Sequence, residues 1–170
     1  MDGREKQAGH VISFKAIGVI HSPFKEPKGT PIQPGGARDV PGTAVVFEPY
    51  QEGLKDLDGF SHVILIYHFH LATPGPLIAK PFLDQESHGI FAIRAPSRPN
   101  PIGISVVRLC GVDDGRLHLK DVDIVDGTPL LDIKPYVPDF DVRTVEKTGW
   151  LETQTDQMSR FRDDGRFSQK

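Results

Sequence analysis

The sequence predicts a mainly β fold, either a closed barrel or a sandwich, on three observations. Seventeen glycines and fifteen prolines among 170 residues favour short strands and frequent turns over long helices. Several short runs of β-branched and aromatic residues are separated by turn signals. The strands of a parallel α/β sheet alternate with helices, and no such alternation is present among these runs.

Length and charge limit the classes of protein that the chain can represent. One domain of 170 residues is long enough to bury its own core. A net charge of −3 gives no general attraction to nucleic acid, so such contact would need a local basic patch. No apolar stretch approaches 18 residues and no signal sequence opens the chain, which predicts a cytoplasmic protein without a membrane span. The single cysteine, Cys110, lies in an apolar run and is expected to be a buried thiol.

The first third of the chain predicts two strands joined by a long loop. Residues 11–20 alternate partly and form a first strand, in which Gly18 indicates a bulge or a close backbone approach. Residues 21–42 are rich in proline and glycine and too long for an ordinary connection, so they are a functional or disordered loop. A short strand follows at residues 43–47, and residues 49–57 can form a helical turn.

The middle of the chain contains the strongest strand signals. Residues 61–70 form the clearest strand, and the continuous apolar run inside it predicts burial on both faces or nearly so. Residues 72–84 are irregular because three prolines interrupt them. Two further strands, at residues 89–94 and 103–112, flank a stiff loop.

The last strands follow closely spaced turns. Asp114 and Gly115 form a hairpin signal before a returning strand at residues 117–120, and the alternation continues over 121–124. A turn at 126–129 precedes a short strand at 130–133. We therefore expect a barrel domain over residues 11–140. Residues 141–170 form a C-terminal extension that packs on the barrel or is partly disordered, with a solvated or helical tail from residue 154.

The loop between Arg94 and Gly103 is the most informative stretch. Proline fixes φ and lacks an N–H, so three prolines make this segment rigid and unsuited to a strand or helix interior. A rigid loop can hold Arg94, Arg98 and Asn100 in set directions. The alternative is a Pro-rich turn whose arginines are simply solvated.

Two clusters of titratable residues could carry chemistry. His68 and His70 lie two apart on one strand and share a face, with His62 six residues before His68. Two histidines could bind a metal, but no third ligand is evident, which favours histidines that line a pocket. Four carboxylates at 121, 123, 126 and 132 could act in acid–base chemistry or face a cation, or could belong to turns. There is no nucleotide-binding glycine motif and no zinc-type cysteine spacing.

Four strings of residues resemble one family. Residues 17–25 (IGVIHSPFK), 59–62 (GFSH), 98–103 (RPNPIG) and 123–136 (DIVDGTPLLDIKPY) are similar, in order, to the TrmO (TsaA-like) family of S-adenosylmethionine-dependent tRNA methyltransferases. The resemblance implies a single-sheeted antiparallel β-barrel with long Pro/Gly-rich loops, usually a homodimer, that methylates threonylcarbamoyladenosine beside the tRNA anticodon. Bacterial members carry a further C-terminal domain, whereas this chain ends about thirty residues after the barrel motifs.

The resemblance also implies which residues form the site. The S-adenosylmethionine-binding residues it implies are Ile32, Gln33, Pro34, His70, Leu71, Arg94, Asp123, Asp126, Gly127, Thr128 and Pro129. The residues expected to shape the pocket or meet the tRNA are Arg98, Asn100, Lys134 and Tyr136. The base that takes a proton from the acceptor is Asp126 or His70, and no metal is required. The alternative function is a non-catalytic barrel module that binds S-adenosylmethionine or RNA.

Overall fold

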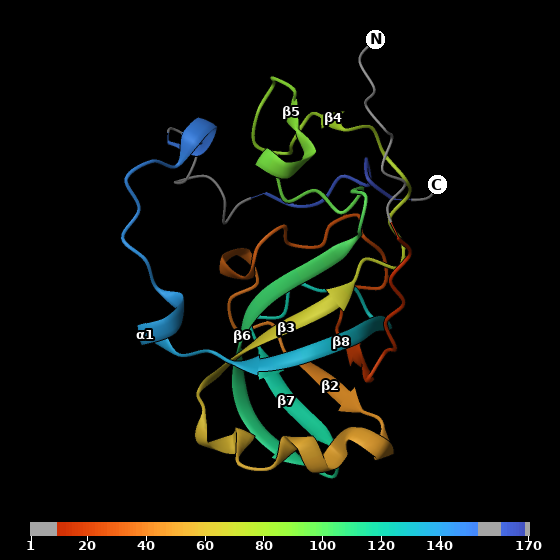
Figure 1. Cartoon of the computed structure of the whole chain (residues 1–170), viewed down its shortest axis with the longest axis vertical. Coiled ribbons are helices and arrows are strands. Elements are labelled where there is room, and N and C mark those ends of the chain that lie inside the picture. The colour runs from red at the N-terminus through yellow and green to blue at the C-terminus, as the bar shows by residue number, and fades with distance from the viewer. Residues whose placement is uncertain (1–9, 153–160, 169–170) are drawn as a thin grey trace.

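The protein folds into a closed six-stranded antiparallel barrel with a loop-rich region at one end (Figure 1). The computed structural model describes residues 10–152 and 161–168. Around the barrel the strands follow the order β1, β2, β7, β6, β3, β8. Their bounds are β1 (Gly18–His21), β2 (Gly42–Val46), β3 (His62–His68), β6 (Ile102–Asp113), β7 (Arg116–Lys120) and β8 (Thr128–Pro135). The predicted mainly β barrel is confirmed.

Period-two alternation explains how these strands build the core. In β3, Val63, Leu65 and Tyr67 are buried, while the residues between them keep part of their surface exposed. The strand is therefore buried on one face only, and the expectation of burial on both faces was wrong. The other strands follow the same rule. The barrel core contains Ile20, Ala44, Val46, Val63, Leu65, Tyr67, Val107, Leu109, Leu117, Leu119, Val122, Ile124 and Leu130.

Strand β6 connects the barrel to the loop-rich end. It pairs with β3 along its first half, from Ile102 to Arg108, and with β7 along its second half. A register shift falls between Leu109 and Gly111. Cys110, at this irregularity, is exposed. The expectation of a buried thiol was wrong because Leu109, not Cys110, takes the inward position of the pleat.

Helical structure is short and lies outside the barrel wall. The 3₁₀ segment η2 (Glu48–Leu54) forms where a helical turn was predicted. The remaining short segments are η1 (Pro34–Gly36), η3 (Leu57–Gly59), η4 (Ile90–Ala92), η5 (Gly149–Leu151) and α1 (Pro138–Asp141). A small two-stranded sheet pairs β4 (Ile78–Ala79) with β5 (His88–Gly89) above the barrel in Figure 1.

Three predicted strands differ from the structure. Residues 89–94 form the end of β5 and η4, because Ile90 and Ile93 are both buried at a spacing of three residues. The first strand begins only at Gly18, and the residues before it are largely exposed. Residues 121–124 bury Val122 and Ile124 without a strand, since Asp121 has a positive φ of 65°.

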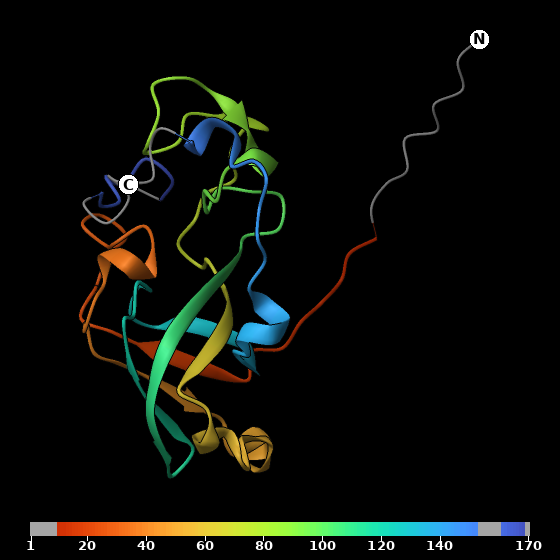
Figure 2. The same ribbon diagram turned by 90° about the vertical axis from the view of Figure 1, so that its left-hand side faces the viewer.

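A second apolar cluster lies in the loop-rich end, apart from the barrel core. Ile90, Ile93, Ala95 and Phe167 are buried together, with Phe82 and Trp150 packed against them. Figure 2 shows the C-terminal segment crossing this end of the molecule. The expected helix does not form over residues 161–168, which contain a turn at 165–167. Phe167 is buried there, whereas Arg162, Asp164 and Arg166 are exposed, so the expected solvation holds for part of the segment. Residues 154–160, 169 and 170 lie outside the described residues.

Among the described residues, none of the helices combines the length and apolar character needed to cross a membrane.

Gly103 provides a test of the junction between barrel and loops. A Cβ placed there would lie 2.2 Å from Cε2 of Tyr67 and 2.9 Å from Cζ of Phe69. The Tyr67 ring is buried and cannot move aside freely. We expect Gly103→Ala to destabilise the fold by about 1–3 kcal/mol, as overpacking does. Urea unfolding followed by circular dichroism measures this change.

Gly111, in the same strand, is the matched control. A Cβ at Gly111 would meet no heavy atom within 4 Å. Gly111→Ala should therefore leave the free energy of unfolding nearly unchanged. Equal effects of the two substitutions would contradict the packing at Gly103.

Candidate functional site

A cavity of about 770 Å³ lies between the end of the barrel and the loops above it. Its walls come from segments far apart in sequence: the loop after β1, the end of β3, the start of β6, the segment before β8 and the C-terminal segment. A volume of this size suits a ligand of the dimensions of a nucleoside derivative.

The cavity brings together most of the predicted site residues. Those that line it are Ile32, Gln33, His70, Leu71, Arg94, Arg98, Asn100, Asp123 and Thr128. Those that do not line it are Pro34, Asp126, Gly127, Pro129, Lys134 and Tyr136. That any of these fifteen residues contacts a ligand stays a prediction.

The sequence reasoning missed many lining residues, among them six aromatic ones. Phe91 is 78% exposed at the cavity although it follows the buried Ile90. Ile104 is 56% exposed and lies on the outward face of β6, where alternation alone indicates solvent. Further missed residues are Tyr67, Phe69, Phe82, Trp150 and Phe167. Only Tyr67 could have been found, because its strand position points it inward.

A chain of buried polar groups lies where the cavity meets the barrel core. The Ser105 hydroxyl donates to Oδ1 of Asp123 at 2.7 Å, and the Tyr67 hydroxyl lies 3.1 Å from the Ser105 oxygen. Ser105 and Tyr67 are buried, and Asp123 borders the cavity. Burial raises the pKa of Asp123 to about 6, against the opposing effect of the Ser105 hydrogen bond. Burial, with the nearby Asp123 charge, also raises the pKa of Tyr67. The cavity therefore contains a carboxyl group poised near neutral pH and a phenol that stays protonated.

His70 lies at the edge of the same cavity, just beyond β3. Its backbone N–H donates to the carbonyl of His68 at 2.8 Å, which makes a tight turn at the strand end. Burial lowers the pKa of the imidazole, and neighbouring His68 contributes in the same direction. The ring is consequently neutral at physiological pH and can accept a proton.

The predicted stiff loop carries two arginines with different roles. Arg94 is exposed and lines the cavity, so its guanidinium is available to an anionic group. Arg98 donates from Nη1 to the carbonyl of Ile93 at 3.2 Å and thereby braces the loop. Backbone hydrogen bonds from Arg98 to Pro96 and from Phe69 to Pro101 fix the loop further. The predicted rigidity thus has a physical basis beyond the prolines themselves.

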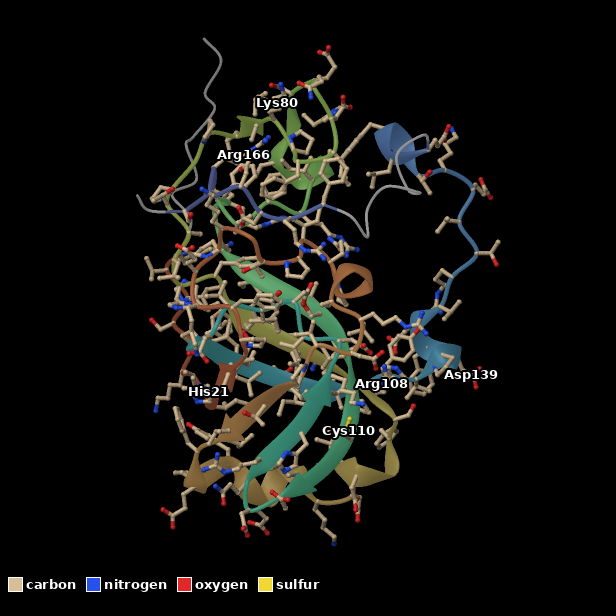
Figure 3. The ribbon with its side chains drawn as sticks, turned by 180° about the vertical axis from the view of Figure 1, so that it is seen from behind. His21, Lys80, Arg108, Cys110, Asp139 and Arg166 are labelled. Atoms are coloured by element: carbon tan, nitrogen blue, oxygen red, sulfur yellow. The ribbon has the colours of Figure 1, made fainter. Side chains whose placement is uncertain are left out.

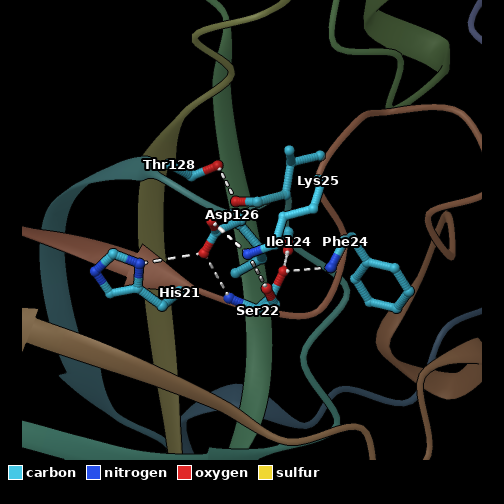
Figure 4. Close-up of polar contacts among 8 residues, drawn as sticks. His21, Ser22, Phe24, Lys25, Ile124, Asp126 and Thr128 are labelled. Atoms are coloured by element: carbon cyan, nitrogen blue, oxygen red, sulfur yellow. Dashed lines mark hydrogen bonds and ion pairs between the residues drawn. The ribbon is translucent and has the colours of Figure 1, made fainter.

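Asp126 is held in a polar cluster outside the cavity (Figure 4). Its carboxylate accepts from Lys25 Nζ at 2.8 Å and from the Ser22 backbone N–H at 3.1 Å, and it lies 3.1 Å from Nδ1 of His21. The hydrogen bond from Lys25 is the main reason that the pKa of Asp126 falls to about 2. Such a carboxylate is a weak base. Its contacts fix the 21–25 loop to the turn before β8.

Lys134 and Tyr136 lie along β8 and just after it, away from the cavity. Lys134 forms an ion pair with Asp132 at 2.7 Å, and the Tyr136 ring packs edge-on against His62. Asp121 is likewise engaged, since it accepts hydrogen bonds from Arg108. Among residues 10–152 and 161–168, no group of three His, Cys, Asp or Glu side chains is placed to hold a metal ion.

Comparison with known proteins identifies the family. The model of the tRNA-methyltransferase O N-terminal domain matches residues 19–142. The chain belongs to this family. The resemblance of the four sequence strings is thereby confirmed.

Two curated relatives and one solved structure illustrate the similarity. A probable S-adenosyl-L-methionine-binding protein of Pyrococcus abyssi is 58% identical, over 92% of this chain and 85% of the relative. The tRNA (adenine(37)-N6)-methyltransferase of Escherichia coli is 41% identical, over 74% of this chain and 57% of the relative. A crystal structure of TrmO from Pseudomonas aeruginosa has a TM-score of 0.71 and 40% identity, over 85% of this chain and 63% of that one. The chain therefore spans less than two thirds of the last two proteins.

The raised pKa of Asp123 predicts a specific pH dependence of stability. The folded-state pKa of about 6 exceeds the ordinary value of 3.8, so the folded protein holds this proton more tightly than the unfolded chain does. This contribution is complete below about pH 4 and is lost as pH rises through about 6. It amounts to at most about 3 kcal/mol.

Asp123→Asn removes this titration while keeping an oxygen that can accept from Ser105. Relative to the wild type, the melting temperature of the variant should rise between pH 4 and pH 7. Scanning calorimetry across this range measures the difference. A constant difference between the two proteins would show that Asp123 is not desolvated in the native state.

Proposed function

We propose that this protein is an S-adenosylmethionine-dependent tRNA methyltransferase of the cytoplasm. Its acceptor is the exocyclic nitrogen of threonylcarbamoyladenosine, next to the anticodon. Family membership and the names of its relatives support the enzyme class and the methyl donor. The observation that carries the proposal is the cavity, which combines an exposed arginine, a half-buried carboxyl group with a raised pKa and a neutral histidine.

The charges around the cavity fit the methyl donor. S-adenosylmethionine has a carboxylate, which suits the guanidinium of Arg94, and a permanent sulfonium cation, which suits the carboxylate of Asp123. Aromatic walls accommodate the adenosine portion through stacking and burial. Above its pKa of about 6, Asp123 is ionised and attracts a cation. Gln33, Leu71 and Thr128 complete the predicted contacts.

The transfer itself requires positioning and a proton acceptor. The donor supplies the electrophilic methyl group, the S–CH₃ bond breaks, and an N–CH₃ bond forms in line with it. The acceptor nitrogen then releases one proton. We assign this proton to the neutral imidazole of His70, because Asp126 is paired with Lys25 outside the cavity.

Basic residues at the cavity end support contact with an RNA backbone. Arg98 lines the cavity, and Lys80 lies at the same end of the molecule, beside Arg166, whose guanidinium is paired with Asp164 (Figure 3). Cys110 and His21 lie on the barrel, away from this end. Lys134, predicted to shape the pocket or meet the tRNA, is paired with Asp132 on β8 instead. A local basic rim on an acidic protein agrees with selective rather than general RNA binding.

A non-catalytic module that binds S-adenosylmethionine or RNA is the second candidate. The relative from Pyrococcus abyssi, which matches most of this chain, is named only as a binding protein. In that case the cavity holds the donor without an acceptor reaching it. Turnover distinguishes the two functions.

Methyl transfer to tRNA tests the proposed function. The full-length protein is incubated with S-adenosylmethionine labelled in the methyl group and with total tRNA from a strain that lacks the corresponding activity. We expect label in threonine-decoding tRNA, in methylated threonylcarbamoyladenosine after nuclease digestion. Donor binding without labelled RNA would contradict the enzyme and favour the binding module.

Arginine variants link this activity to the cavity. Arg94→Ala should weaken donor binding by about 1–3 kcal/mol in calorimetry, as loss of a charge-assisted hydrogen bond does. Arg116→Ala removes an equal charge at the start of β7, outside the cavity, and should leave binding unchanged. Equal affinities of both variants would remove Arg94 from the site.

We also propose that the protein forms a homodimer through an apolar strip on the outside of the barrel. The strip consists of the cross-strand pairs Ile64–Val106 and Ile66–Ile104 of β3 and β6, and of Ile102, which pairs with His68. Ile102 and Ile104 also line the cavity, so the strip continues to the cavity edge. Ile102 and Ile104 are 41% and 56% exposed. A contiguous apolar surface of this kind favours a second copy of the chain.

Light scattering after size-exclusion chromatography tests the dimer. The wild type should have about twice the mass of one 18.8 kDa chain. Val106→Glu, which places a charge in the strip, should shift the mass to that of one chain. A monomeric wild type at micromolar concentration would refute the proposed interface.

A further inference from the structure

The C-terminal segment, residues 161–168, is attached to three of the loops that surround the cavity. This segment lies beyond residues 19–142, which the family model matches. At its start, Gly29 donates its N–H to the carbonyl of Asp163 at 2.7 Å, and Asp163 donates to the carbonyl of Thr30 at 2.8 Å. Arg162 also donates from Nη2 to the carbonyl of Gly36 at 3.1 Å. These bonds hold the long loop that carries Ile32 and Gln33.

The far end of the segment is attached to the other side of the cavity. The Phe167 carbonyl accepts from the buried Ser97 hydroxyl at 2.9 Å and from the Thr73 N–H at 3.3 Å. The Phe167 ring is 8% exposed and packs edge-on against Phe82, with centroids 5.2 Å apart. Ser97 belongs to the stiff loop that carries Arg94. One short segment therefore joins the Gln33 loop to the Arg94 loop.

The same segment contributes directly to the cavity wall. Asp163, Phe167 and Ser168 are among the lining residues, opposite groups supplied by the barrel. Between its two attachments the chain turns at Gly165, which has a φ of +87°. Arg166 is part of this turn, and its guanidinium lies 5.1 Å from the Phe82 ring centroid. The charged side chains of Asp164 and Arg166 are thus exposed, while Phe167 is buried.

We propose that residues 161–168 are an integral part of the donor site. They close the cavity and position the two loops that bind the donor. This inference rests on the proposed function. A loop held in its binding conformation loses little entropy on binding, and a closed wall excludes water from the charged groups. Without the segment, the Gln33 loop loses its backbone partners at Asp163, and the cavity opens beside Ile93 and Ala95. Phe167 is accordingly a positioning residue.

Trp150 provides a direct readout. It is the single tryptophan of the chain and lines the cavity. Its indole Nε1 donates to the carbonyl of Ala92 at 2.9 Å, and its ring stacks on His88 at 4.7 Å between centroids. Donor binding should change its fluorescence. Titration of the full-length protein with S-adenosylmethionine therefore gives a dissociation constant without relying on activity.

Phe167→Ala should raise this dissociation constant about tenfold or more, the scale of loss when a pocket contact is removed. Leu119→Ala is the matched control, since it removes a buried side chain from the barrel core, away from the cavity. It should lower the melting temperature and leave the dissociation constant unchanged. If both variants bound S-adenosylmethionine equally weakly, the loss of affinity would reflect general destabilisation, and the inference would be overturned.

Two further variants keep the test decisive if Phe167→Ala folds poorly. Ser97→Ala removes only the hydroxyl that holds the Phe167 carbonyl, and a chain that ends at residue 160 removes the whole segment. Both should weaken donor binding while the far-ultraviolet circular dichroism of the barrel persists. Wild-type affinity in the shortened chain would overturn the inference alone. Absence of donor binding by the full-length chain would overturn the proposed function, and the inference with it.

Discussion

The site depends on one interruption of the barrel core, the polar chain from Tyr67 through Ser105 to Asp123. Elsewhere, apart from Thr128 at the start of β8, the inward positions of the strands are apolar and fill the interior. At this end Gly103 removes a side chain, and the polar chain replaces hydrophobic contacts with two hydrogen bonds. A buried carboxyl group costs free energy unless it has partners or a ligand. The raised pKa of Asp123 is the signature of that cost, and a cationic ligand would offset it.

The loops above this interruption are long but well constrained. Proline fixes the backbone of the Arg94 loop, and Arg98 braces it against Ile93. The Asp126 cluster fixes the 21–25 loop to the turn before β8. Phe167 and Asp163 hold the remaining loops from the C-terminal side. The Asp126 cluster lies outside the cavity, whereas Arg98, Asp163 and Phe167 also form part of its wall. A site built from loops can thus be rigid when side-chain and backbone hydrogen bonds take the place of the hydrogen bonds between the strands of a sheet.

The sequence was informative where periodicity governs structure. Strands β3 and β6 were predicted from their runs of β-branched and aromatic residues, and the hairpin at Asp114 was predicted from its turn residues. Residues 89–94 were misassigned because an apolar run can satisfy a 3₁₀ turn as well as a strand when its buried residues are three apart. Cys110 was misplaced because an apolar run does not reveal which of its positions points inward.

The site was predictable only in part, for a related reason. Gln33, Arg94 and Asp123 came from a resemblance to a family, and the structure brings all three to one cavity. Phe91, Trp150 and Phe167 could not be predicted, because no period relates them and only tertiary contacts place them together. Asp126 was one of two candidate bases, the other being His70. Its contacts with Lys25 and His21 depend on a loop about one hundred residues away in sequence.

A crystal structure of the full-length protein with S-adenosylmethionine tests the central claim most directly. We expect the donor in the 770 Å³ cavity, its carboxylate on Arg94 and its sulfonium on the side of Asp123. The Phe167 ring should border the ligand. Donor bound instead at the shallow surface around His21, Lys25 and Asp126, with the cavity empty, would contradict the account.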